Sequence, residues 1–166
     1  MTNSASAAEV ATSVELDAAT QRQLGVDLYN STWSLLEKPD RTPAETDEMI
    51  HRAHASRWHW ARAADTATVN LARGEWLCSR VYATLGRGEP ALWHARRSVE
   101  ISEALGADAR ETWDLPAAYE AMARASFAAG DPASGALWKA KATAALAEVA
   151  DPDDRELIAQ DLATLP

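Results

Sequence analysis

The stretch Leu71–Gly106, LARGEWLCSRVYATLGRGEPALWHARRSVEISEALG, decides the fold, because a similar pattern follows at Leu115–Ala150, LPAAYEAMARASFAAGDPASGALWKAKATAALAEVA. Aligning the two segments places Gly86 on Gly130, 44 residues further along the chain. Small residues then coincide at positions where two helices must approach closely: Ser79 with Ala123, Ala91 with Gly135, and Ser98 with Ala142. Each segment therefore predicts a pair of helices joined by a glycine turn.

The first segment resembles a tetratricopeptide repeat (TPR), above all over Trp76–Glu103. Tyr82 lies four residues before the turn glycine, Ala91 follows the turn, and Ser98 stands where that family has a small residue. The second segment departs further, since Ser126 takes the place of Tyr82, and the period exceeds the usual TPR length of about 34 residues. The resemblance implies antiparallel helix hairpins stacked into a right-handed array with a concave face, and it names no ligand.

Helix starts are marked by a side-chain acceptor followed by proline, which caps the helix and then supplies a residue that needs no N–H. Thr42-Pro43 with Glu45 forms a capping box, and the further starts are Glu89-Pro90, Asp131-Pro132, Asp151-Pro152 and a looser Asp114 with Pro116. Abundant alanine and few β-branched residues favour helix throughout. We predict an all-α, TPR-like protein of about three hairpins plus a C-terminal capping helix, near residues 14–37, 43–63, 68–85, 90–105, 114–129, 132–149 and 152–164.

Length and charge limit the organisation and the partners. The 166 residues fit a single TPR-like domain over residues 14–166, after a small, polar segment 1–13 that we expect to be a disordered N-terminal tail. With a net charge of −9, the chain would be repelled by nucleic acid and by anionic lipid, so neither is an expected partner.

The single cysteine and the N-terminal sequence bear on the location. Cys78 cannot form an internal disulfide, and it falls at a position where the repeat expects a buried apolar residue, so we interpret it as a packing residue. No apolar run reaches the roughly 18–20 residues of a membrane span. The first residues also lack the basic start and apolar run of a secretory signal, and the expected location is the cytoplasm.

The concave face supplies the candidate binding residues. In TPR proteins the first helix of each pair lines this face, which implies inward-pointing side chains at Arg73, Trp76, Arg80 and Ala83, and at Ala117, Glu120, Arg124 and Phe127. From the leading hairpin, Tyr29, Asn30 and Trp33 would face the same hollow. Arginine and indole groups suit an anionic, partly flat ligand. The alternative is that Arg80 and Arg124 pair with Glu75, Glu120 or Asp114 as ordinary ion pairs between helices.

The segment His51–Trp60 holds three of the four histidines. On a helix, Asp47, Ile50, His51, His54, Trp58 and Ala61 share one face, which we expect to pack against the first and third helices, with Asn70, Tyr29, Glu75 or a water as imidazole partners. A metal centre of Glu48, His51 and His54, with His94 as a fourth ligand, is the sharper hypothesis. It is disfavoured because ligands at successive steps of three residues drift around the helix by about 120° in all.

Trp58 and Trp60 cannot both face one core, because two residues on a helix lie roughly 200° apart. One of them must be exposed, bound to a neighbouring hairpin or at an interface. A patch that includes Trp60, Trp93 or Trp138 could join two copies of the chain into a homodimer.

Together these features predict a non-catalytic binding module that takes an anionic peptide end, a protein partner or a small metabolite, and that needs no cofactor. The predicted ligand-binding residues are Tyr29, Asn30, Trp33, His51, His54, Asn70, Arg73, Trp76, Arg80, Glu120 and Arg124. The alternative is a small, metal-dependent or metal-free enzyme with His51 and His54 in the same pocket.

Overall fold

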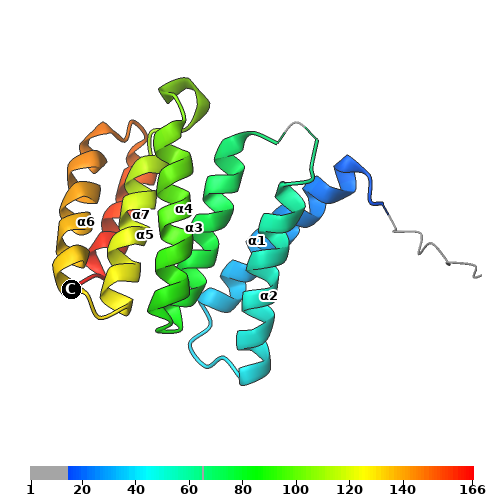
Figure 1. Ribbon diagram of the computed structural model, residues 1–166, viewed down its shortest axis with the longest axis horizontal. Coiled ribbons are helices and arrows are strands. Elements are labelled where there is room, and N and C mark those ends of the chain that lie inside the picture. Colours follow the sequence, from blue (N-terminus) through cyan, green and yellow to red (C-terminus); the bar gives the residue numbers. More distant parts are fainter. Residues whose placement is uncertain (1–14, 65) are drawn as a thin grey trace, which may run out of the picture.

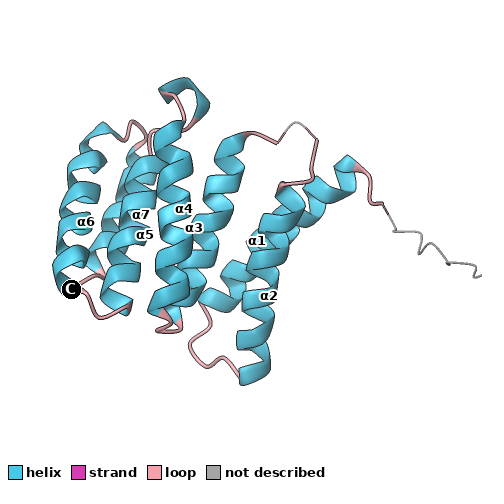
Figure 2. Cartoon of the chain, viewed as in Figure 1, coloured by secondary structure: helices cyan, strands magenta, loops and turns pink. Residues whose placement is uncertain are grey.

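A computed structural model describes residues 15–64 and 66–166, so the tail expected at 1–13 lies outside the described residues. Within them the chain forms seven α-helices and no strand, which confirms the all-α prediction (Figure 2). The helices are α1 (Ala18–Leu36), α2 (Pro43–Trp60), α3 (Thr68–Thr84), α4 (Gly88–Ala104), α5 (Asp114–Ala128), α6 (Pro132–Ala145) and α7 (Pro152–Ala163). Two short 3₁₀ helices follow α4 and α6, at Ala107–Ala109 and Leu146–Glu148, and the second takes the end of the range predicted as helix 132–149.

The helices lie side by side, and each runs antiparallel to the next (Figure 1). Each even-numbered helix packs against the helix before it and the helix after it. The odd-numbered helices also contact one another in the order α1, α3, α5 and α7. These four helices therefore form one continuous side of the molecule, and this side carries the site described below.

Local signals place the helix ends much as the sequence predicts. The Thr42 hydroxyl accepts from the Glu45 N–H at 3.3 Å, and the Glu45 carboxylate accepts from the Thr42 N–H at 2.9 Å, so the capping box forms. Asp131 and Asp151 cap α6 and α7. Glu89 does not cap α4, which already begins at Gly88.

The two predicted glycine turns share one geometry. Gly86 and Gly130 have φ values of 68° and 78°, a left-handed conformation that glycine adopts without a steric penalty. In each turn the next residue donates its N–H back to the preceding helix, Arg87 to Tyr82 at 2.9 Å and Asp131 to Ser126 at 3.0 Å. Because the chain reverses within this tight turn, α4 begins directly after it, at Gly88 rather than at the predicted residue 90.

The small residues shared by the two repeats lie at close helix contacts, as predicted. The Ser79 hydroxyl donates to the Ala91 carbonyl, and the Ser98 hydroxyl donates to the Ala72 carbonyl, both at 3.0 Å. In the second repeat Ala123 and Ala142 are fully buried. A Cβ atom at Gly135 would lie 2.8 Å from the Phe127 ring.

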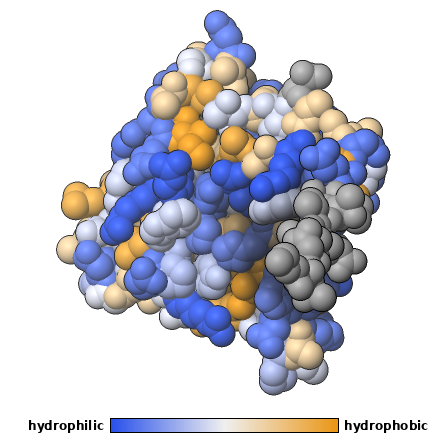
Figure 3. Space-filling model, turned by 45° about the vertical axis from the view of Figure 1, so that its right-hand side comes forward, coloured by the Kyte–Doolittle hydropathy of each residue, from blue (hydrophilic) through white to orange (hydrophobic). Residues whose placement is uncertain are grey.

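The buried apolar residues form two clusters, a larger one across α4–α7 and a smaller one among α1–α3. On the face shown in Figure 3, the hydrophobic patches are interrupted by hydrophilic side chains. Trp58 and Trp93 are about half exposed, which agrees with the expectation that Trp58 and Trp60 would not share a core. Among the described helices, none combines the length and the apolar character needed to cross a membrane.

The prediction of which face of α2 is buried is wrong. His51, His54 and Trp58 are exposed, and the buried residues of the helix are Met49, Ala53 and Ser56. Small side chains let α2 approach α1 closely, and the buried Ser56 hydroxyl donates to the Gly25 carbonyl at 2.7 Å. The larger residues that suggested the other face lie outside this contact.

Candidate functional site

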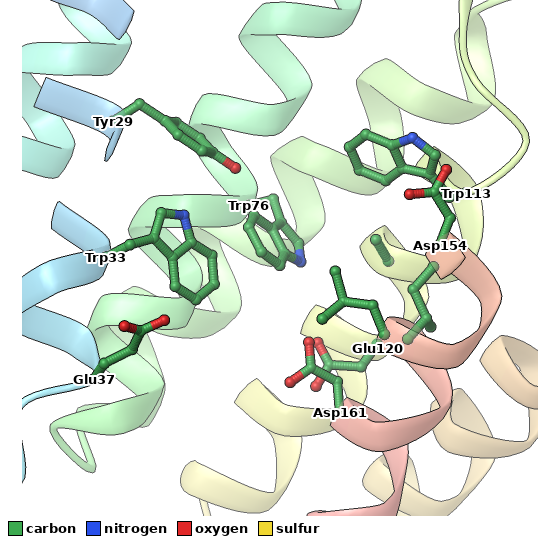
Figure 4. Close-up of a pocket in the computed structure, with 11 residues that line it drawn as sticks. Tyr29, Trp33, Glu37, Trp76, Trp113, Glu120, Asp154 and Asp161 are labelled. Atoms are coloured by element: carbon green, nitrogen blue, oxygen red, sulfur yellow. The ribbon is translucent and has the colours of Figure 1, made fainter. Parts of the chain in front are cut away.

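A hollow of about 450 Å³ lies on the side formed by the odd-numbered helices. Its aromatic walls come from α1, α3 and the residue before α5, namely Tyr29, Trp33, Trp76 and Trp113. Its acidic walls come from the end of α1, from α5 and from α7, namely Glu37, Glu120, Asp154 and Asp161 (Figure 4). We call this hollow the aromatic pocket.

The aromatic rings are held by each other and by arginines. The ring centroids of Trp33 and Trp76 lie 5.6 Å apart at an angle of 36°. The guanidinium carbon of Arg80 lies 5.5 Å from the Trp76 ring, and that of Arg73 lies 4.4 Å from the Trp113 ring. Burial raises the pKa of Tyr29 to about 12, so its hydroxyl stays neutral at physiological pH.

Glu120 is the most unusual group in the pocket wall. Its side chain is 1% exposed, and its Oε1 atom accepts a hydrogen bond from Arg124 Nε at 2.7 Å. Its Oε2 atom, although buried, has no hydrogen-bond partner among the described residues. Burial raises the pKa of this carboxyl group, although the charges of Arg80 and Arg124 oppose the shift.

A second buried polar atom of the pocket wall also lacks a partner among the described residues, the indole Nε1 of Trp76. An indole N–H can only donate, whereas a carboxylate oxygen accepts. Buried polar groups are nearly always hydrogen-bonded, so an unpaired donor and an unpaired acceptor in one pocket wall call for an explanation.

Arg80 and Arg124 are held by carboxylates, which is the alternative that the sequence left open, and Arg73 is held in the same way. Arg73 binds Asp114 through two hydrogen bonds of 2.8 and 3.0 Å. Arg80 forms an ion pair with Asp161 of α7 and lies 3.8 Å from Glu120. Asp161 was not among the partners that the sequence suggested.

Arg124 is also held by several hydrogen bonds. Besides the Glu120 carboxylate, it donates to the Asp161 carbonyl at 3.0 Å and to the Thr164 hydroxyl at 2.8 Å. Neither Arg80 nor Arg124 lines the aromatic pocket. Both act as supports behind its acidic wall.

The remaining acidic residues make the pocket negative. Glu37 and Asp154 form no ion pair within the described part of the chain. Partial desolvation and then the nearby carboxylates of Asp151 and Glu111 raise the pKa of Asp154, as expected in a negative potential. The lining thus carries more carboxylates than the arginines behind it neutralise.

A smaller hollow of about 290 Å³ adjoins the aromatic pocket and shares Tyr29 and Trp113 with it. Besides Tyr29, three more of the predicted binding residues line this second hollow: Asn30, Asn70 and Arg73. Of the predicted set, the aromatic pocket itself contains Tyr29, Trp33, Trp76 and Glu120. Four further lining residues were not predicted: Glu37, Trp113, Asp154 and Asp161.

The predicted histidines lie away from both hollows. His51 is exposed on α2, and His54 shares a hydrogen bond of 2.9 Å between its Nε2 atom and the Tyr82 hydroxyl. The disfavoured metal set of Glu48, His51, His54 and His94 does not come together among the described residues, where Glu48 pairs with Arg52 at 2.8 Å. His54 and His94 do come together, with ring centroids 5.1 Å apart.

Comparison of the chain with family models, curated proteins and solved structures gives no match. The function therefore has to be inferred from the chemistry of the site. That chemistry consists of aromatic rings and carboxylates around a hollow of small-molecule size, with one unpaired donor and one unpaired acceptor in its wall.

Proposed function

We propose that the protein is a non-catalytic, TPR-like binding module whose aromatic pocket takes the cationic group of a small molecule or peptide. The observation that carries the proposal is the buried, unpaired Oε2 atom of Glu120 in a wall of tryptophan rings. A bound ammonium group would donate to this oxygen and lie against the rings.

The charges of the pocket support a cation rather than the anion expected from the sequence. An anionic ligand would meet Glu37, Asp154 and Asp161 without a free guanidinium to bind, because Arg73 and Arg80 are already paired. A cation over tryptophan faces gains about 0.5–1 kcal/mol at exposed sites and about 2 kcal/mol or more when water is excluded. Carboxylates around the rings add to this attraction.

The unpaired Trp76 N–H limits the class of ligand further. It requires an acceptor on the ligand, such as a carbonyl or hydroxyl oxygen, in addition to the ammonium group. An amino group next to a carbonyl, as at a peptide N-terminus, meets both requirements. The pocket thus favours α-amino amides over simple amines.

The TPR-like assignment is supported by the repeat period, by the two equivalent glycine turns and by the close contacts at equivalent small residues. The resemblance also implies that the first helix of each pair lines the binding face. The aromatic pocket is built from α1, α3, α5 and α7, which fits this arrangement.

Three probes of similar size and different charge test the proposal: benzylammonium, benzyl alcohol and benzoate. Isothermal titration calorimetry on the full chain should find the tightest binding for benzylammonium and the weakest for benzoate. Tighter binding of benzoate would instead support the anionic ligand that the sequence predicts. Equal affinities would show that the carboxylates play no part in selection.

A second comparison tests the role of Trp76. Phenylalanine amide carries an ammonium group and a carbonyl oxygen, whereas phenethylamine lacks the carbonyl. The amide should bind more tightly, and the difference should disappear in Trp76→Phe, which keeps an aromatic ring but removes the N–H donor.

A further inference from the structure

Three side chains on the α2–α3–α4 part of the molecule form a second cluster, separate from the aromatic pocket. His54, Cys78 and His94 each offer one ligand atom, and these atoms lie within 4.8 Å of one another. No other group of metal-ligating side chains of this kind occurs among the described residues. We call these three residues the His–Cys cluster.

The orientation of His94 is fixed from behind. Its Nδ1 atom lies 2.7 Å from Glu75 Oε2, and the other oxygen of Glu75 accepts from Arg57 Nε at 2.9 Å. A carboxylate at Nδ1 holds the proton there, which leaves the lone pair of Nε2 free. Metal-binding histidines commonly have such a carboxylate behind them.

Tyr82 positions the other side of the cluster. Its ring stacks on that of His94 with an interplanar angle of 9°, and its hydroxyl lies 2.9 Å from His54 Nε2. Cys78 is fully buried beneath the two histidines, on the third helix of the array. Three helices thus converge on one point with two imidazoles and one sulfur.

We propose that His54, Cys78 and His94 bind a zinc ion. Zn²⁺ takes nitrogen and sulfur ligands at about 2.0–2.3 Å in a tetrahedral arrangement, which sets its ligand atoms about 3.5 Å apart. The three ligand atoms already lie within 4.8 Å of one another, and His54, the exposed member, can rotate toward the other two. Glu75 supplies a negative charge behind His94.

The cluster meets solvent at His54, its exposed member, so water could supply a fourth ligand from that side. Three protein ligands with one open position are typical of zinc sites that hold an exchangeable water. When the metal binds, the Cys78 S–H bond breaks, the proton leaves to solvent, and the thiolate sulfur donates its electron pair to the ion. No oxidation or reduction takes part.

Cobalt substitution tests the site directly. The untagged full chain, freed of metal with a chelator, should take up one equivalent of Co²⁺ and show a thiolate-to-cobalt charge-transfer band in the near ultraviolet. Zn²⁺ should abolish this band by competition. Cys78→Ser should lack the band, and His94→Ala should bind cobalt at least about tenfold more weakly.

His51→Ala provides the matched control, because His51 lies on the same helix, three residues from His54, outside the cluster. It should leave the cobalt spectrum and the affinity unchanged. Circular dichroism of each metal-free variant separates loss of a ligand from loss of the fold. If Cys78→Ser unfolds, Cys78→Ala and the intensity of the charge-transfer band in the wild type still decide the question.

Three results would overturn the proposal: no metal uptake by the wild type, uptake without a sulfur charge-transfer band, or uptake that Cys78→Ser leaves unchanged. The last two would place the ion elsewhere on the acidic surface. Because the aromatic pocket contains none of the three ligands, these results leave the proposed cation binding unaffected.

Discussion

Arg124 binds Glu120 through only one of the two carboxylate oxygens. Its Nε atom lies 2.7 Å from Oε1, while Oε2 remains buried and without a partner among the described residues. The ion pair therefore has two roles. It compensates the charge of a carboxylate that is 1% exposed, and it leaves one oxygen of a residue that lines the aromatic pocket without a partner.

Arg124→Ala should destabilise the fold. Removing Arg124 leaves the buried Glu120 carboxylate with only the more distant guanidinium of Arg80, 3.8 Å away, and breaking a buried ion pair costs about 3–5 kcal/mol. The control is Arg97→Ala, whose partner Glu100 and guanidinium are both about half exposed, and this change should cost about 0–1 kcal/mol. Urea unfolding of both variants measures the difference. Equal stabilities would mean that Arg124 is not a structural support and is free to bind a ligand.

Glu120 should make stability fall as the pH rises above the ordinary glutamate pKa of 4.5. Burial raises the pKa of Glu120 in the folded state, despite the charges of Arg80 and Arg124. Between 4.5 and the folded-state pKa, the folded chain therefore binds more protons than the unfolded chain. The free energy of unfolding decreases with pH over this window and levels off above it.

The comparison with Glu120→Gln isolates this effect, because the amide keeps the shape of the side chain but does not titrate. Urea unfolding of both proteins across a pH series gives the difference in stability. The wild type should lose stability relative to the variant as the pH rises. A constant difference would contradict the raised pKa.

Local chemistry explains why much of the fold follows from the sequence. The capping box at Thr42 and the turns at Gly86 and Gly130 depend on residues within a few positions of each other, so their patterns can be interpreted without a structure. The repeat also predicts the close helix contacts, because small residues occur at equivalent positions of both segments.

The parts that were not predicted depend on contacts between distant segments. Asp154 and Asp161 reach the pocket because α7 packs against α5, and no local pattern reports where a terminal helix docks. The face of α2 was misassigned because its contact uses alanine and serine, whereas the tryptophan and histidines of the other face carry the stronger apolar and aromatic pattern. Cys78 was correctly expected to be buried, but its neighbours His54 and His94 come from other helices.

Gly88→Ala tests the tight packing between the α3–α4 turn and the end of α5. A Cβ atom at Gly88 would lie 2.3 Å from the Ala129 Cα atom, so the backbone of one segment must move. We expect a loss of about 1–3 kcal/mol, as for other overpacked contacts. Gly106→Ala is the control, since a Cβ there meets nothing within 4 Å, and it should change stability by less than about 0.5 kcal/mol. Thermal or urea unfolding that gives equal values would show that this contact is loose.

Trp76→Leu should weaken benzylammonium binding by about tenfold or more, because a desolvated cation–π contact contributes about 2 kcal/mol and leucine offers none. Leucine still fills part of the space beside Trp33, so the fold should persist. Trp93→Leu is the matched control, since Trp93 is 53% exposed on α4 and does not line the pocket. Calorimetry is the suitable measurement, because both variants alter the intrinsic fluorescence. Equal affinities in the two variants would mean that the cation binds outside the aromatic pocket, whereas a selective loss in Trp76→Leu locates it against this ring.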